Sequence, residues 1–112
     1  MSILELDTQK MRAGAARAAI MLRVLANEDR MLLLCQLTRG EACVSELEKL
    51  LEIRQPTLSQ QLSVLRAEAI VSTRREGKKI FYRVSDARAI AVLQTLNILY
   101  CPAPEASGAQ PQ

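Results

Sequence analysis

The sequence contains no histidine and no tryptophan among its 112 residues. Without histidine, a Ser–His–Asp triad, a Cys–His nucleophile pair and the His-ligated zinc sites of hydrolytic enzymes are all excluded. Glycine is scarce too, because the chain has only four, and none lies in a glycine-rich phosphate-binding loop. We therefore expect a protein that is not an enzyme, with no catalytic residue, no metal site and no cofactor.

The sequence also has no long hydrophobic run. None approaches the roughly 20 apolar residues that span a bilayer, and the N-terminus lacks the basic and apolar regions of a signal peptide. We expect a cytoplasmic protein without a membrane partner. In that compartment thiols are kept reduced, so a disulfide would act as a signal more than as a structural link. The three cysteines, Cys35, Cys43 and Cys101, are an odd number and form no C-x-x-C motif.

What the chain does have is the composition of one globular domain, with 49% hydrophobic and 24% charged residues. Its net charge is only +3, but the charge is unevenly distributed. The segment 54–83 holds seven basic and two acidic residues, a net charge of +5. A concentrated basic region of this kind is expected where a protein contacts nucleic-acid phosphates.

Hydrophobic periodicity predicts mostly helices, with one pair of strands. We expect residues 1–7 to be flexible, residues 8–101 to form the domain, and the proline-containing tail 102–112 to be disordered. Within the domain, the predicted elements are helices over about 8–26, 28–39, 45–52, 57–68 and 87–100, and strands at 70–73 and 80–84. Asn27 is a predicted helix cap, Ser45 and Glu48 form a predicted capping box, and Ser85-Asp86 opens the last helix. Gly77 is predicted to form the turn of a charged hairpin tip over 74–79.

Two short helices joined by a tight turn and followed by a basic hairpin predict a winged helix-turn-helix. The second helix of such a pair enters the DNA major groove, and the hairpin, or wing, contacts the backbone. An ordinary solvated helix and hairpin is the alternative, but the order of the elements favours a double-stranded DNA operator, an inverted repeat, as partner. The predicted DNA-binding residues are Gln55, Thr57, Leu58, Ser59, Gln60 and Gln61 in the helix, although Leu58 has inward spacing, and Arg74, Arg75, Lys78 and Lys79 in the wing.

The stretch from Gln55 to Arg66, QPTLSQQLSVLR, resembles the recognition helix of ArsR/SmtB-type repressors, usually S-Q-P-T-V-S-x-H-L-x-x-L-R. The resemblance extends over about residues 10–101. It implies a homodimer built on the first and last helices, and release from DNA when an inducer binds or modifies the protein.

The standard metal sites of that family are incomplete in this chain. Its arsenic and cadmium sensors carry E-L-C-V-C-D-L, where this sequence has Cys43 at the first cysteine but Ser45 at the second. A single thiolate does not hold a soft metal. The zinc sensors use histidine, which is absent here. From its position before a helix cap, we expect Cys43 to be exposed and incidental.

The placement of Cys35 in L-x-C-x-L and of Cys101 at the end of the last helix resembles the sulfide- and persulfide-sensing branch, the BigR/SqrR/YgaV type. That branch implies a redox-sensing pair whose thiols join as a disulfide or through inserted sulfur from reactive sulfur species. Periodicity alone would make Cys35 an ordinary core residue. Neither position activates its thiol, since Cys35 lies among leucines and Cys101 at a helix C-terminus. A soft-metal sensor using all three cysteines, a peroxide sensor and a DNA-binding module without a switch remain alternatives.

Overall fold

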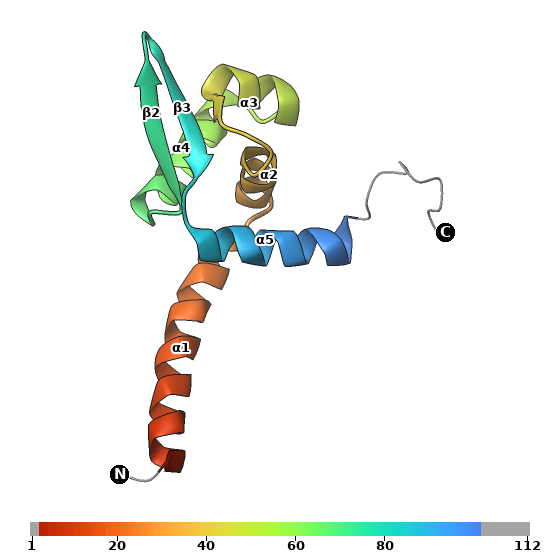
Figure 1. Cartoon of the computed structure of the whole chain (residues 1–112). Coiled ribbons are helices and arrows are strands. Elements are labelled where there is room, and N and C mark those ends of the chain that lie inside the picture. Colours follow the sequence, from red (N-terminus) through yellow and green to blue (C-terminus); the bar gives the residue numbers. More distant parts are fainter. Residues whose placement is uncertain (1–2, 102–112) are drawn as a thin grey trace, which may run out of the picture.

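The computed structural model describes residues 3–101, and Figure 1 shows how their helices and strands are arranged. The elements are α1 (Ile3–Leu25), α2 (Glu28–Leu37), β1 (Ala42–Cys43), α3 (Val44–Leu51), α4 (Gln55–Ala67), β2 (Val71–Glu76), β3 (Lys79–Val84) and α5 (Ala87–Tyr100). The predicted order of five helices with a hairpin between the fourth and the fifth is confirmed. The predictions for residues 1, 2 and 102–112 lie outside the described residues.

The winged-helix core forms where α2, α3 and α4 pack against one another and against the base of the sheet. The sheet is antiparallel, with strand order β1-β3-β2. Leucines from the three helices fill the centre and are almost completely buried; they are Leu33, Leu34, Leu47, Leu58, Leu62 and Leu65. These leucines come from three different helices and pack closely against one another. Their packing therefore holds the helix pair and the wing in one rigid arrangement.

Side-chain caps begin α2, where Asn27 was predicted to be the cap, and α5, which was predicted to open at Ser85-Asp86. The Asn27 side chain accepts a hydrogen bond of 3.0 Å from the Arg30 amide at the start of α2. Asp86 accepts bonds of 2.8 and 3.3 Å from the amides of Arg88 and Ala89 at the start of α5. These bonds satisfy amides that the helix itself leaves free, so local sequence alone is enough to start both helices.

The capping box of α3 lies two residues earlier than predicted. Cys43 is the N-cap, and the Glu46 carboxylate accepts a 2.9 Å hydrogen bond from its amide, so the box of Ser45 and Glu48 is wrong. The reason is β1, which the sequence did not reveal. Cys43 pairs with Phe81 of β3, so the chain is extended up to Cys43 and turns into a helix directly afterwards. Cys43 is only 4% exposed, so the expectation that it is exposed is wrong too.

The wing is a longer hairpin than predicted. The two strands pair from Val71 opposite Val84 to Glu76 opposite Lys79, and the turn contains Gly77, whose φ is +64°. That conformation favours glycine because it has no Cβ. Arg74 and Arg75 therefore lie within β2, and the tip is shorter than the predicted segment 74–79.

Helix α1 begins at Ile3 instead of near Thr8, so residues 3–7, expected to be flexible, belong to the helix. It extends away from the rest of the chain, as Figure 1 shows in orange and red. The residues at helical spacing along α1 are Met11, Ala15, Ala18, Leu22 and Leu25, and of these only Leu25 is buried, while Met11 is 70% exposed. At the end of α5, the side chain of Tyr100 is 76% exposed. Both helices thus leave apolar side chains uncovered in the single chain.

Among residues 3–101, no helix is both long enough and apolar enough to cross a membrane.

Candidate nucleic-acid interface and thiol site

Helix α4 divides into a core face and a polar face. Leu58, Leu62 and Leu65 are buried, whereas Gln55, Ser59 and Gln60 are exposed. The hydroxyl of Ser59 donates a 3.3 Å hydrogen bond to the side-chain oxygen of Gln55, one turn earlier. An exposed row of amides and hydroxyls has the donors and acceptors that base edges require.

The other three residues of α4 that were predicted to contact DNA are less exposed than Gln55, Ser59 and Gln60. Leu58 is fully buried, so its assignment as a DNA-contacting side chain is wrong. Thr57 and Gln61 are half-buried. The side-chain oxygen of Gln61 accepts a 2.8 Å hydrogen bond from Nη1 of Arg30 in α2. Gln61 is therefore held by an internal partner that its position in the sequence does not reveal.

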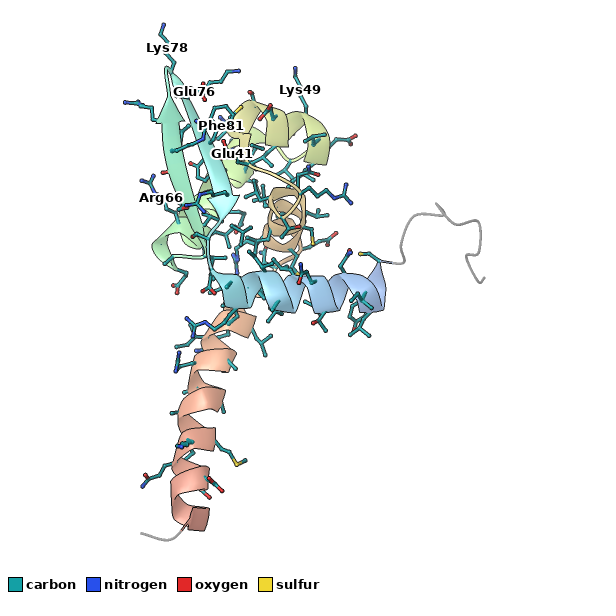
Figure 2. The ribbon with its side chains drawn as sticks, viewed as in Figure 1. Glu41, Lys49, Arg66, Glu76, Lys78 and Phe81 are labelled. Atoms are coloured by element: carbon teal, nitrogen blue, oxygen red, sulfur yellow. The ribbon has the colours of Figure 1, made fainter. Side chains whose placement is uncertain are left out.

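Arg74, predicted to hold the DNA backbone, is bound within the protein. Its guanidinium forms an ion pair and a hydrogen bond with Glu41, pairs with Glu76 at 2.7 Å, and lies 4.7 Å from the centre of the Phe81 ring. Figure 2 shows Glu41, Glu76 and Phe81 gathered along the wing, with Lys78 at its tip. The hydrogen bond from Arg74 lowers the pKa of Glu41, so the pair stays charged near neutral pH. Arg74 thus fastens the wing to the segment before β1.

The other predicted wing cations are arranged differently. Arg75, Lys78 and Lys79 are exposed, and within residues 3–101 none of them forms a side-chain hydrogen bond or an ion pair. Their charges are available to an external anion. Their contact with the DNA backbone stays a prediction.

We predict that Lys78→Ala lowers the salt dependence of DNA binding and that Arg74→Ala does not. Losing one phosphate contact reduces the slope of log K against log salt concentration by about 1. The charge of Arg74 is already neutralised by two carboxylates. Removing Arg74 therefore changes the wing but not the number of counterions that the DNA releases when the protein binds. Fluorescence anisotropy over a salt series measures both slopes. An unchanged slope for Lys78→Ala would contradict the assignment of the wing.

Cys35, within α2, and Cys101, directly after α5, face one hollow of about 660 Å³. Cys35 is half-buried in α2, and Cys101 is exposed directly after α5. The walls are mostly apolar and come from the end of α1, from α2 and from α5; they include Leu22, Leu25, Met31, Leu32, Leu96 and Tyr100. We call this space the thiol hollow. The fold therefore brings together the two thiols that the sequence singled out.

The chemistry of Cys35 is set by its surroundings. Burial raises the pKa of the Cys35 thiol, and the nearby Cys101 thiol raises it further, while Arg39 acts in the opposite direction. A raised pKa leaves little thiolate at neutral pH, so Cys35 reacts slowly with weak electrophiles. This agrees with the expectation that its position does not activate it.

Cys43 is not part of this arrangement. It is buried between β1 and α3, where its sulfur lies 3.3 Å from the hydroxyl of Ser45. Within the described part of the chain, no group of three or more Cys, Asp or Glu side chains is placed to hold a metal ion.

Sequence reasoning missed the partners that hold these residues. Glu41 is 33 positions from Arg74, and Arg30 is 31 positions from Gln61. Periodicity and local motifs carry no signal for contacts over such separations.

Comparison with known proteins supports the resemblance to ArsR/SmtB-type repressors. Residues 27–73 match the family described as bacterial regulatory protein, arsR family. The chain is 48% identical to a biofilm growth-associated repressor of Agrobacterium fabrum over 90% of its own length and 86% of that protein's. It is 39% identical to the transcriptional activator HlyU of Vibrio cholerae, over 88% of this chain and 91% of that protein. The crystal structure of the transcriptional repressor BigR from Xylella fastidiosa superposes with a TM-score of 0.78 at 41% identity, over 93% of this chain and 99% of that one. With this similarity over nearly its whole length, the chain belongs to the ArsR family of DNA-binding transcriptional regulators, which are not enzymes.

Proposed function

We propose that this protein is a homodimeric repressor that leaves its operator when reactive sulfur species bridge Cys35 and Cys101. The observation that carries the proposal is the thiol hollow, which two cysteines far apart in the sequence share. Its volume of about 660 Å³ leaves room for a bridge longer than a direct disulfide, which would require Cα atoms about 4.4–6.8 Å apart.

The proposed reaction balances with an inorganic polysulfide as the oxidant. One cysteine thiolate attacks the terminal sulfur of the polysulfide, forms a persulfide and releases a polysulfide anion that is shorter by one sulfur atom. The second thiolate attacks the inner sulfur of that persulfide, which forms the disulfide and expels hydrosulfide. Two thiols lose two electrons in total, and one sulfane sulfur is reduced to sulfide. If both cysteines become persulfides first, attack of one on the other forms a trisulfide and again expels hydrosulfide.

The dimer is proposed from the uncovered helices. Apolar side chains of α1 and α5 are exposed in the single chain, among them Met11, Leu22, Ile98 and Leu99. Large exposed apolar patches mark interaction surfaces, and a second copy would cover them. A two-fold dimer presents two recognition helices, so its operator would be an inverted repeat.

Two features argue for sulfur over the alternatives. Burial of Cys43 at the start of α3 leaves only two thiols in the hollow, fewer than the three that a soft-metal sensor with all three cysteines would use. The raised pKa of Cys35 disfavours the fast thiolate reaction that a peroxide sensor needs, whereas a slower attack on a polysulfide sulfur still fits it. One related structure is described as reduced HlyU from Vibrio cholerae, so a redox state is distinguished in that relative.

Intact-mass measurement of the full-length protein after separate treatment with sulfide, tetrasulfide, hydrogen peroxide and arsenite tests the proposal. We expect tetrasulfide to make the protein lighter by two hydrogens for a disulfide or heavier by sulfur for a longer bridge, and peptide mapping of the treated protein to place the link between Cys35 and Cys101. Arsenite should leave the mass unchanged. If tetrasulfide left both thiols free, the proposed function would be wrong.

A further inference from the structure

We propose that Arg30 is a positioning residue that holds the recognition helix in its DNA-reading orientation and connects it to the wall of the thiol hollow. This inference rests on the proposed function, because it concerns how a change at the hollow reaches the DNA-binding face. It assigns a role to a residue of α2 that belongs neither to the cysteine pair nor to the wing.

The guanidinium of Arg30 joins two parts of the fold. Its Nε donates a 2.6 Å hydrogen bond to the carbonyl oxygen of Val24, and its Nη2 donates one of 3.5 Å to that of Arg23. These carbonyls belong to the last turn of α1, where helix carbonyls lack intrahelical partners. The third nitrogen, Nη1, donates the 2.8 Å bond to Gln61 of α4. One planar group thus ties the end of α1 to the recognition helix.

The same junction between α1 and α2 forms one wall of the thiol hollow. Leu25, Ala26, Asn27 and Met31 line the hollow, and they surround Arg30 in the sequence. Asn27 is also bonded to Arg30 directly, since its side chain accepts the 3.0 Å bond from the Arg30 amide. A displacement of this wall therefore moves both the backbone of Arg30 and the carbonyls that its guanidinium binds.

The rigidity of the guanidinium makes this connection sensitive to small movements. Its donors lie in a fixed plane, so it cannot follow the α1 carbonyls and Gln61 if they move apart. When the thiols are free, as in this structure, all three bonds are made. A bridge between Cys35 and Cys101 draws α5 toward α2 across the hollow, shifts the junction and breaks the bond to Gln61. The recognition helix then loses the contact that orients it.

A direct role in binding DNA is the competing explanation for Arg30. The residue lies beside the polar face of α4, where it borders a surface hollow together with Ser59, Gln60 and Ser63. A phosphate contact would give Arg30 a salt-dependent contribution to affinity, whereas a positioning role would not. Salt dependence therefore separates the two explanations.

The test compares Arg30→Met and Arg30→Lys with Arg23→Met in the full-length protein. Arg30→Met keeps an unbranched side chain without donors, and Arg30→Lys keeps the charge but not the planar fork. Arg23→Met removes one exposed charge from the same junction and leaves the Arg23 carbonyl in place. The probe is a duplex selected from a random library by the reduced wild-type protein. Affinity is measured with reduced and with tetrasulfide-treated protein, and the bridged fraction is determined by intact mass.

For wild type and Arg23→Met we expect bridging to weaken binding by about tenfold or more, within the usual range of allosteric coupling. For both Arg30 variants we expect the bridge to form normally. We also expect the DNA affinity of these variants in the reduced, unbridged state to fall toward the affinity of the bridged protein. The ratio of the unbridged to the bridged affinity then shrinks to within about threefold, and the salt slope is unchanged. Gln61→Met combined with Arg30→Met should reduce affinity no further than the larger single effect, because both remove the same bond.

The outcomes separate this inference from the proposed function. If the bridge forms in the Arg30 variants and the ratio stays at the wild-type value, the role of Arg30 is refuted and the sulfur switch stands. A salt slope reduced by about 1 in Arg30→Met would make Arg30 a phosphate contact instead. If no bridge forms in wild type, the proposed function fails. The positioning role is then still tested by whether Arg30→Lys, with its thiols reduced, binds DNA more weakly than wild type. Thermal melts of both variants identify any that fail to fold.

Discussion

Replacing Cys35 or Cys101 with serine is expected to abolish release of DNA by polysulfide while leaving the reduced protein's affinity within about twofold of wild type. Serine is close to cysteine in size but forms no sulfur bridge. Cys101 is exposed and Cys35 only half-buried, so neither substitution opens a large cavity. The effect is all-or-none because each bridge needs both sulfur atoms. Anisotropy with reduced and tetrasulfide-treated protein measures it.

Cys43→Ser is the matched control for those two variants. Serine is among the preferred N-cap residues, so the start of α3 should tolerate it. We expect Cys43→Ser to release DNA as wild type does. A Cys43→Ser protein that no longer responds would instead favour the soft-metal alternative, in which all three thiols act together. Retained release by either Cys35→Ser or Cys101→Ser would contradict the paired switch.

Leu58→Ala and Ser59→Ala are expected to have opposite consequences, although the two residues are adjacent in the recognition helix. Leu58 is fully buried among the core leucines, so its truncation should lower the free energy of unfolding by about 2–5 kcal/mol. That is a large share of the roughly 5–15 kcal/mol that stabilises a typical domain. Ser59 is exposed, so Ser59→Ala should change stability by less than about 0.5 kcal/mol and lower DNA affinity.

Urea unfolding at one fixed protein concentration measures both stabilities, since a dimer's apparent stability depends on concentration. Binding to the selected duplex gives the affinities. A stable Leu58→Ala protein that binds DNA poorly would restore Leu58 as a DNA contact and contradict its assignment to the core.

The order and type of the main elements were predictable because local interactions determine them. Leucine periodicity placed α4, and the side chains of Asn27 and Asp86 began α2 and α5 where they were predicted to. Resemblance in the recognition helix and in the cysteine spacing then indicated the family. Family membership is confirmed, whereas the roles of the individual cysteines stay predictions.

The errors share a physical cause, which is pairing between distant segments. The strand β1 has two residues and exists because it pairs with β3, so no local pattern could reveal it. That pairing buried Cys43 and moved the cap of α3. Helical spacing identifies the apolar residues of α1 and α5 but not what covers them, and only the structure shows that many of them are exposed in the single chain.

The sequence by itself determined a basic, histidine-free winged helix-turn-helix with one cysteine in the second helix and one at the end of the last, because composition, caps and periodicity act within a few residues. Only the tertiary structure decided which wing cations have no ion-pair partner within residues 3–101 and which thiols face the same hollow. It paired Arg74 with Glu41, joined Arg30 to Gln61 and placed Cys35 and Cys101 around one hollow. Those contacts depend on how helices pack in three dimensions, which spacing along a chain does not encode.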